Sequence, residues 1–432
     1  MVGQQLRQQP EKLRIAICGG GPGGLGAAIA LSALPNVEIS LYEQAKELRE
    51  IGAGIRIGYN CWKMLELLGA ADRVKGHRKD AVVHRNGLNG HVVGATGVSS
   101  LPIQYHPQRV RRTRLQSALL SKVPRGIIQL NKRLVSLENL EQGGVRLVFQ
   151  DGTETIVDLV VGADGIRSVV RENIFPDHSI KFTGTTVWRV LIPATAVAHI
   201  PDLPSATSWW HGPAGHVFFC PVDNPAEVGE SERLFEIAAR NTVDPETVVG
   251  KRLSWGIPAT NERVQSHFTD YDPRVRDALA QVPEGQWREF SAFAGPRLEK
   301  LTAWDKVVLI GDASHPLSGA FGSGAAFALE DGWILARAIE HTRSSREPLT
   351  NALEIFDTIR SPYYLRMYQY LDGQKQKVQE AHGATPTETF EARLQVKLAS
   401  LGGDEALPWI YRNDIEDVWG RYLGDRSSVD QI

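Results

Sequence analysis

The chain has 432 residues, 42% of them hydrophobic and 23% charged, a composition that excludes a disordered protein and allows a large core with two closely joined domains. Its 48 Lys and Arg residues nearly balance 50 Asp and Glu residues, and no run of like charge is long enough to favour nucleic acid or a membrane surface over a small-molecule partner. The three cysteines lack C-x-x-C spacing, so we expect no disulfide framework, no metal site and a reducing, cytoplasmic location.

The first predicted element is a short apolar strand over residues 13–18, which runs into the sequence GGGPGGLG and then into a helix. Residues 36–43 form the next expected strand. A strand, glycine turn, helix and strand within about thirty residues predict a mononucleotide-binding unit. Pro22 and the glycines interrupt the apolar stretch 15–34, so we expect neither a membrane helix nor a signal peptide there.

The glycines of this turn fit the pattern G-x-G-x-x-G. Gly19 permits the tight turn, Gly21 lets the backbone approach a pyrophosphate, and Gly24 lets the helix pack on the strand. The helix N-terminus adds N–H groups and positive partial charge. Glu43 ends the second strand about twenty positions later, where a carboxylate accepts hydrogen bonds from an adenosine ribose and repels a 2′-phosphate. NADP is therefore disfavoured here, whereas FAD and NAD remain alternatives.

The middle of the chain changes in texture. Residues 145–161 alternate, turn at Asp151-Gly152 and become continuously apolar, which predicts a β-hairpin that returns the chain to the buried sheet. Residues 176–297 contain short strand-like segments and five of the ten tryptophans, typical of a separate antiparallel sheet. We therefore expect a discontinuous nucleotide-binding domain (1–175 and 298–345), a substrate domain (176–297) and a helical C-terminal region (346–432).

A second glycine-rich turn follows a buried strand at residues 305–312 and has none of the lysines of a phosphate-binding loop. Asp312 ends that strand and is a natural acceptor for the ribityl hydroxyls of FAD. The helix expected to start near Gly324 directs its positive end at the flavin pyrimidine. This second anchor favours FAD over NAD.

Three ordered motifs, GGGPGG with Glu43, GADGIRSVVR (162–171) and GDASHP (311–316), resemble the single-component (group A) FAD-dependent aromatic hydroxylases, the class that includes p-hydroxybenzoate hydroxylase. LREIGAGI (48–55), GPAGHVFFCPV (212–222) and PWIYRNDIEDVW (408–419) are similar to salicylate hydroxylase-like members and fungal FAD-dependent monooxygenases. The resemblance spans nearly the whole chain. It implies an α/β fold with a Rossmann-type FAD-binding domain, an inserted antiparallel β-sheet substrate domain and a helical C-terminal region.

The resemblance also implies which residues hold FAD. The glycine loop and Glu43 would hold the ADP half, and Asp164 and Gly165 would serve both FAD and the transient NADH or NADPH. The full set of expected cofactor residues is Gly19, Gly21, Gly24, Glu43, Arg56, Arg112, Asp164, Gly165, Asp312, Gly324 and Ala325.

The chemistry implied by the resemblance is the reduction of flavin by NAD(P)H, addition of O2 at flavin C4a, and hydroxyl transfer from the hydroperoxide to a phenol or 2-hydroxybenzoate, with or without loss of CO2. Arg189 is the first catalytic candidate because a fixed cation lowers the pKa of a phenol that faces it. His216 and its neighbour His211 are candidates to accept the phenol proton or to orient a carboxylate. Several aromatic side chains are candidates to wall the pocket: Trp188, Trp209, Trp210, Phe218 and Phe219. We expect a monomer or a homodimer.

Two positions depart from the resemblance. Cys220 stands where many relatives have tyrosine, and Gly319 stands where relatives usually have proline. The substrate contacts and the loop geometry of relatives therefore do not transfer directly. Three alternatives remain: hydroxylative dearomatisation or epoxidation, a flavin-dependent reductase or dehydrogenase without oxygen insertion, and a non-catalytic flavin or nucleotide sensor.

Overall fold

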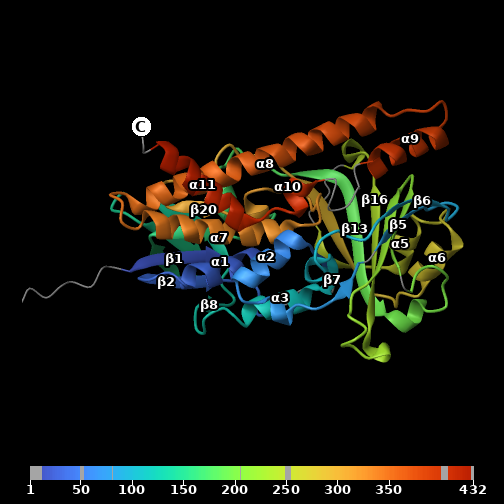
Figure 1. Cartoon of the computed structure of the whole chain (residues 1–432), viewed down its shortest axis with the longest axis horizontal. Coiled ribbons are helices and arrows are strands. Elements are labelled where there is room, and N and C mark those ends of the chain that lie inside the picture. Colours follow the sequence, from blue (N-terminus) through green and yellow to red (C-terminus); the bar gives the residue numbers. More distant parts are fainter. Residues whose placement is uncertain are drawn as a thin grey trace, which may run out of the picture.

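The computed structural model describes residues 12–48, 53–79, 81–204, 206–248, 254–399 and 407–429. Two large sheets organise it: a six-stranded sheet, and an eight-stranded sheet that contains the long strand β13 (Lys181–Pro193) (Figure 1). The motif LREIGAGI (48–55) and residues 251–258 of the predicted substrate domain lie partly outside the described residues. Between the helices and sheets are short 3-10 turns: η1 (Ala71–Arg73), η2 (Ile103–Tyr105), η3 (Ala194–Val197), η4 (Glu230–Glu232), η5 (Pro245–Thr247) and η6 (Gly311–Ala313).

The first sheet has six strands and is parallel except at one edge, where β19 runs against β20. Strand β1 lies between β12 and β2 and pairs in parallel with both, so its side chains are buried and apolar. In spatial order the strands are β19 (Thr302–Ala303), β20 (Val307–Leu309), β12 (Leu159–Gly162), β1 (Leu13–Cys18), β2 (Val37–Tyr42) and β8 (Ile128–Gln129).

Helices and two small sheets surround this parallel sheet. Helix α1, rich in Gly and Ala, packs closely on α7, whose central residues are almost all buried. The helices of this part are α1 (Pro22–Ser32), α2 (Tyr59–Leu67), α3 (Arg112–Leu120), α4 (Val169–Ile174) and α7 (Gly324–Thr342). The small sheets consist of β11 (Glu154–Val157), β10 (Val145–Phe149) and β9 (Leu134–Asn139), and of β3 (Gly54–Ile57), β7 (Gln108–Arg111) and β4 (His77–Arg78).

The predicted hairpin is confirmed: β10 and β11 pair antiparallel, and the chain then enters β12 of the parallel sheet. The return of the chain at β20 is confirmed as well, because β20 pairs with β12 and not with an element of the second sheet. The parallel sheet is thus assembled from the beginning of the chain and from residues beyond 300.

The second sheet has eight strands and is antiparallel except where β14 runs parallel to β5. Its outer face packs on the short helices α5 (Asn261–Gln265) and α6 (Pro273–Ala280) and forms a separate hydrophobic core. In spatial order the strands are β17 (Trp255–Ala259), β18 (Trp287–Ala294), β13 (Lys181–Pro193), β16 (Leu234–Thr242), β15 (Gly215–Pro221), β14 (Thr207–Gly212), β5 (Val82–Asn86) and β6 (Val92–Thr96).

One part of this sheet departs from the expected division of the chain. Residues 82–96 were expected in the nucleotide-binding domain, but their strands β5 and β6 extend the eight-stranded sheet. The parallel pairing of β5 with β14 joins segments more than a hundred residues apart, and the local sequence pattern of 82–96 does not specify that partner. The expected substrate domain therefore takes two strands from the N-terminal part.

The last part of the chain is helical, as expected. Its helices are α8 (Pro348–Glu380), α9 (Pro386–Ala399), α10 (Pro408–Tyr411) and α11 (Ile415–Val429). Helix α8 spans the molecule from the parallel sheet towards the eight-stranded sheet, where α9 follows it (Figure 1). In the first half of α8, buried Arg360 binds Asp331 and Glu330 of α7, at 2.7 and 3.1 Å. In the described part of the chain, no helix has the length and apolarity needed to cross a membrane.

Candidate active site

The residues expected to bind the cofactor lie at the carboxyl ends of four adjacent strands, β20, β12, β1 and β2. Gly19 follows β1, Glu43 follows β2, Asp164 follows β12, and Asp312 follows β20. Ligands of open α/β sheets bind at this edge, where the order of the strands reverses. The structure therefore brings together residues that are almost three hundred positions apart in the sequence.

The glycine loop has the geometry that its spacing predicts. Gly19 has φ +113°, and a Cβ there would lie 2.3 Å from Ala163 O. A Cβ on Gly24 would lie 1.9 Å from Gly19 O, so the helix could not pack where it does with any other residue. At Gly21, by contrast, no atom lies within 4 Å of the Cβ position. Gly19 and Gly24 shape the turn, and Gly21 leaves open space above it.

Glu43 has a contact that sequence reasoning did not predict. Its Oε2 accepts a hydrogen bond from Gly20 N and its Oε1 one from Ala45 N, both at 2.8 Å. The carboxylate thus holds the glycine loop against the end of β2. Each oxygen retains a second lone pair, so Glu43 can orient the loop and still accept a ribose hydroxyl.

Asp164 lies beside the same loop, because Gly19 packs against the backbone of residues 163 and 164. Its Oδ2 accepts a hydrogen bond from Val170 N at 3.1 Å, whereas Oδ1 is buried and has no hydrogen-bond partner among the described residues. Burial raises the pKa of this carboxyl group. Gly165 follows with φ +75° and open space around it. A buried acceptor without a partner, next to the glycine loop, fits a ligand hydroxyl.

Asp312 and Gly324 meet at the start of helix α7. The Asp312 side chain is exposed, and its Oδ1 lies 3.8 Å from the Cβ position of Gly324. Helix α7 begins at Gly324, as predicted, and Ala325 is half-buried in its first turn. The open N–H groups of this turn and the Asp312 carboxylate form one polar edge, suited to the ribityl chain and pyrimidine of a flavin.

The loop before α7 has a shape that proline cannot adopt. Gly319 has φ +70° and the preceding Ser318 has φ +55°, both in the left-handed region. Proline is fixed near φ −65°. A proline would therefore not fit at position 319 of this loop, which ends with Phe321 buried and its carbonyl bound by the Tyr411 hydroxyl at 3.1 Å.

Of the two predicted cofactor arginines, Arg56 reaches this site from β3. Arg56 Nη1 donates a hydrogen bond to Ser323 Oγ at 3.1 Å, and its guanidinium lies 4.6 Å from the centre of the Tyr411 ring. Arg112 begins helix α3, and its backbone N–H binds Ala53 O at 3.0 Å. Arg56 is thus directly connected to the start of α7.

A residue that sequence reasoning passed over, Arg171, connects the two motifs. Its guanidinium is 1% exposed and donates to the carbonyls of Ile166 at 2.7 Å, Ala313 at 3.0 Å and Asp312 at 3.3 Å. Arg171 is the last residue of GADGIRSVVR, and its place in this motif was the feature of the sequence that could have marked it as a site residue. It fixes the end of β20 relative to the end of β12.

The inner face of the eight-stranded sheet is only partly covered. Along β13 and β16 the outward residues are buried against α5 and α6, while Val187, Arg189, Ala238 and Arg240 on the inner face are half-buried. Glu236 on this face accepts two hydrogen bonds from Arg109 of β7, at 2.5 and 2.8 Å. This contact ties the inner face to the sheet of β3, β7 and β4, which bears Arg56, one of the predicted cofactor residues.

Arg189 lies on this inner face, and its Nε is buried without a hydrogen-bond partner among the residues described. Burial, partly offset by the Glu236 carboxylate, lowers its pKa to about 10. Arg109, Arg112 and Arg240 act in the same direction as burial. The guanidinium remains charged at neutral pH in a region with excess positive charge, which favours an anionic ligand.

His216 and His211 also lie on the inner face, with ring centres 6.0 Å apart. Trp209 packs against His216 at 4.8 Å and against Phe218 at 4.6 Å. Sequence reasoning missed His84 of β5, whose Nδ1 lies 3.1 Å from His211 Nε2. Trp209 and Phe218 thus belong to this face, whereas the other predicted aromatic residues, Trp188, Trp210 and Phe219, belong to the outer core.

Cys220 is fully buried, and its Sγ lies 3.1 Å from Thr207 Oγ1. Burial raises the pKa of its thiol to about 11. The thiol is therefore protonated at neutral pH and does not act as a nucleophile.

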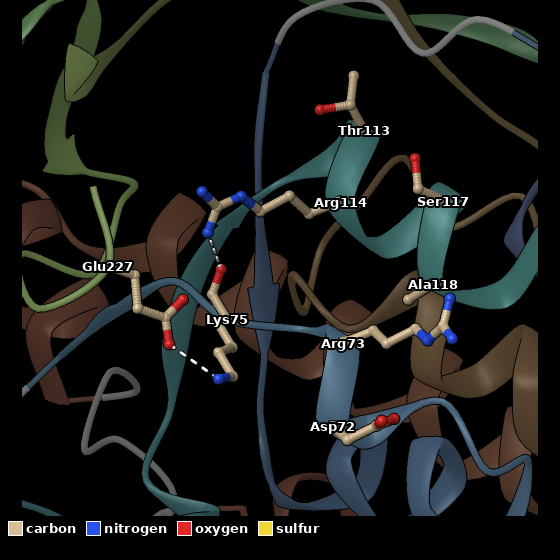
Figure 2. Close-up of a pocket in the computed structure, with 8 residues that line it drawn as sticks. All are labelled: Asp72, Arg73, Lys75, Thr113, Arg114, Ser117, Ala118 and Glu227. Atoms are coloured by element: carbon tan, nitrogen blue, oxygen red, sulfur yellow. Dashed lines mark hydrogen bonds and ion pairs between the residues drawn. The ribbon is translucent and has the colours of Figure 1, made fainter. Parts of the chain in front are cut away.

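A cavity of about 410 Å³ opens at the start of α3, next to the loop after β15 (Figure 2). Two of its cations are engaged: Lys75 Nζ lies 3.0 Å from Glu227 Oε1, and Arg114 Nη1 donates to Lys75 O at 2.9 Å. None of the predicted site residues lines it. In the described part of the chain, His, Cys, Asp and Glu side chains form no group of three that could hold a metal ion.

Comparison with known proteins decides the family. The family model described as "FAD binding domain" matches residues 12–348, which include both glycine loops and all strands of the eight-stranded sheet. The chain belongs to the FAD-binding domain family. The glycine loop, Asp164 and the Asp312–Gly324 edge fit this cofactor, and the family's reductant is NADH or NADPH.

Relatives within this family are hydroxylases and monooxygenases. Salicylate hydroxylase of Pseudomonas putida is 29% identical over 386 residues, covering 83% of this chain and 84% of the relative. 6-Hydroxynicotinate 3-monooxygenase of Bordetella bronchiseptica is 28% identical over 341 residues, covering 77% and 84%. A solved salicylate hydroxylase substrate complex has a TM-score of 0.74 at 22% identity over 95% of this chain and 98% of that one. The chain is thus a single-component FAD-dependent monooxygenase. Its predicted fold class is confirmed.

Proposed function

We propose that the protein uses NAD(P)H and O2 to hydroxylate a phenolic or 2-hydroxybenzoate-like aromatic substrate on the inner face of the eight-stranded sheet. The observation that carries the proposal is the buried Nε of Arg189, which has no hydrogen-bond partner among the described residues and lies on a half-buried face that also bears Trp209 and Phe218. When bound, FAD supplies the oxygen-transfer chemistry that side chains do not. The chain's own residues bind and orient the substrate.

Arg189 and His216 are the proposed catalytic residues. The fixed charge of Arg189 favours the phenolate, whose ortho and para carbons are the nucleophilic positions. Burial lowers the pKa of His216 well below its usual range, so its ring is neutral and can accept a hydrogen bond from the phenol or donate one to its oxygen. Trp209 and Phe218 offer the substrate ring an aromatic wall.

The cofactor residues have proposed roles as well. The glycine loop and Glu43 bind the ADP half, Arg56 and Arg112 contact the cofactor, and Asp312 and Ala325 bind the flavin end. Asp164 and Gly165 also contact NADH or NADPH while it is transiently bound. Cys18, Cys61 and Cys220 are buried and unpaired, which supports a reducing, cytoplasmic setting. We propose a monomer or homodimer.

The test uses the purified holoprotein with a panel of phenols and aromatic acids. We expect at least one to accelerate NAD(P)H oxidation and to yield a product that contains one atom of 18O from 18O2. A product mass that shows the loss of CO2 from the substrate identifies decarboxylation. The rates of oxidation of NADH and of NADPH, measured separately, identify the preferred reductant. Product without label, or turnover with an artificial acceptor in the absence of O2, selects the reductase or dehydrogenase alternative.

A variant tests the role of Arg189. We expect Arg189→Ala to lose at least a hundredfold of the substrate-stimulated rate while retaining FAD, and Arg276→Ala, at an exposed position of α6, to match the wild type. Unchanged turnover in Arg189→Ala removes this residue from the site.

A further inference from the structure

The C-terminal motif PWIYRNDIEDVW (408–419) has no role in the proposed function, yet it packs beside the loop that precedes α7. Its first residues form helix α10, which contacts both α2 and α8 (Figure 1). Ile410 and Ile415 are buried, and the Arg366 guanidinium of α8 lies 4.2 Å from the centre of the Trp409 ring. The motif is therefore held by helices that do not belong to the loop.

Polar contacts fix the motif further. Asn413 Nδ2 donates a hydrogen bond to Glu330 Oε1 of α7 at 3.0 Å, and the Glu330 side chain is fully buried. Asp414 accepts a hydrogen bond from the Tyr59 hydroxyl of α2 at 3.1 Å. The segment around Tyr411 is thus anchored on α2, α7 and α8 together.

Tyr411 touches the residues before α7 both directly and through an arginine. Its hydroxyl donates to Phe321 O at 3.1 Å, and its ring centre lies 4.6 Å from the Arg56 guanidinium. Arg56 in turn donates to Ser323 Oγ at 3.1 Å, and Ser323 is the residue before α7. A Cβ on Gly58 would lie 2.6 Å from Arg56 Nη1. The guanidinium is therefore confined between Gly58, the tyrosine ring and Ser323.

The loop that Tyr411 holds borders open space. In the described part of the chain, no atom lies within 4 Å of the Cβ positions of Gly319 and Gly322. The Phe321 ring packs against Tyr370 of α8, with ring centres 6.1 Å apart. Because glycines leave the backbone free to adopt other conformations, the path of this loop depends on contacts such as the hydrogen bond from Tyr411.

The position of this loop sets the Asp312–Gly324 edge. Ser323 immediately precedes Gly324, the first residue of α7, and the Cβ position of Gly324 lies 3.8 Å from Asp312 Oδ1. A helix N-terminus and a fixed cation near the flavin pyrimidine favour reduced flavin, which carries negative charge. A displacement of either would change the affinity for FAD and also the balance between its oxidised and reduced forms.

We propose that Tyr411 is a positioning residue for the flavin end of FAD. Its ring orients Arg56 and its hydroxyl holds the Phe321 carbonyl, so that the cation and the start of α7 keep their places against the cofactor. The inference rests on the proposed function, in which Arg56 and the start of α7 contact FAD. Tyr411 lies beyond the segment 12–348 that matches the family model, so a part of the chain outside that match adjusts the cofactor site.

The experiment measures the bound flavin in the absence of any aromatic substrate. Flavin fluorescence quenching gives the Kd for FAD, and photoreduction with a reference dye gives the reduction potential of the holoprotein. We expect Tyr411→Leu to raise the Kd for oxidised FAD at least tenfold and to weaken binding of reduced FAD a further tenfold, which lowers the potential by about 30 mV. Tyr411→Phe keeps the ring beside Arg56, so both Kd values should stay within threefold of the wild type.

A double variant tests whether Tyr411 acts through Arg56. If the tyrosine ring orients the cation, Tyr411→Leu should raise the Kd for FAD less than threefold in the Arg56→Met background, although it raises it at least tenfold in the wild type. Equal effects of Tyr411→Leu in the two backgrounds would overturn the inference.

The matched control is Tyr271→Leu, because the buried Tyr271 hydroxyl also donates to a backbone carbonyl, that of Gly215 at 3.3 Å, in the core of the eight-stranded sheet. This variant should lower the melting temperature of the apoprotein and leave the Kd and the potential unchanged. If Tyr411→Leu does not fold, Tyr411→Met, which fills more of the space of the ring, is measured by the same criteria.

The outcomes separate the inference from the proposed function. A Tyr411→Leu variant with the affinity and the potential of the wild type overturns the inference, as does a Tyr411→Phe variant that is as impaired as Tyr411→Leu. Unchanged affinity and potential in Asp312→Ala would count against the proposed flavin end itself and remove the basis of the inference. Failure of every aromatic to stimulate NAD(P)H oxidation would count against the proposed substrate, while the flavin measurements would still decide the role of Tyr411.

Discussion

The glycine loop permits a prediction that separates folding from cofactor binding. A Cβ on Gly24 would lie 1.9 Å from Gly19 O, whereas ordinary contacts begin at 3.4 Å, so Gly24→Ala requires a backbone shift of about 1.5 Å. Such overpacking costs about 1–3 kcal/mol. At Gly21 a Cβ meets no atom within 4 Å, and φ −71° with ψ 179° suits alanine. Gly21→Ala should therefore leave the apoprotein as stable as the wild type to within about 0.5 kcal/mol, since the loss at the helix N-cap and the lower entropy of the unfolded chain nearly cancel.

The two variants should differ in FAD binding. The open space at Gly21 is where the backbone must approach a pyrophosphate, so we expect Gly21→Ala to raise the Kd for FAD at least tenfold, which corresponds to about 1.4 kcal/mol. Flavin fluorescence quenching measures the Kd, and thermal melts of the apoproteins measure stability. If Gly21→Ala binds FAD as tightly as the wild type, or melts as early as Gly24→Ala, the assignment of this loop to the pyrophosphate is refuted.

Two further predictions concern buried polar residues. Arg171→Met removes the donors to three carbonyl groups and should lower the free energy of unfolding by about 3 kcal/mol, measured by urea denaturation. It should also reduce FAD retention, measured by flavin absorbance. Arg125→Met, at an exposed position, is the control, and equal stability of the two variants would contradict the role of Arg171 in joining the ends of β12 and β20. Burial, with the charges of Lys397 and His84, lowers the pKa of His211 to about 3, so below pH 6.5 the unfolded chain takes up a proton that the folded chain does not. Between pH 6.5 and 4.5 the free energy of unfolding of the wild type should therefore fall by about 2–3 kcal/mol more than that of His211→Asn. His91→Asn, at an exposed position, should lose as much stability as the wild type, and parallel pH profiles for the wild type and His211→Asn would disprove the prediction.

Local patterns were sufficient for the cofactor half of the molecule. The strand at 13–18, the hairpin into β12 and the helix start at Gly324 all follow from glycine positions and apolar runs, because short-range sterics and burial determine them. The backbone of the site, with Gly19, Asp164 and Asp312 at one sheet edge, was therefore within reach of sequence reasoning.

The substrate half depends on contacts that no local pattern encodes. His84 reaches His211 only because β5 pairs in parallel with β14, and helix α9 reaches β6, where Leu398 lies at Gly94, only because α8 crosses the molecule before α9 begins. The sequence of β14 does not indicate which face of the strand packs into the outer core, so Trp209 and Trp210 could not be told apart. These partners are determined by tertiary packing.

The position of β12 between β1 and β20 has a consequence for the order of folding. Until residues 307–309 have left the ribosome, the apolar edge of β12, with Val160 and Val161, lacks its parallel neighbour. An unpaired apolar edge is a template for association with other chains. For most of the synthesis of the chain, the N-terminal part therefore has the glycine-loop half of the nucleotide site beside an exposed strand edge. A chain that ends before β20 would be expected to aggregate and not to persist as a small FAD-binding fragment.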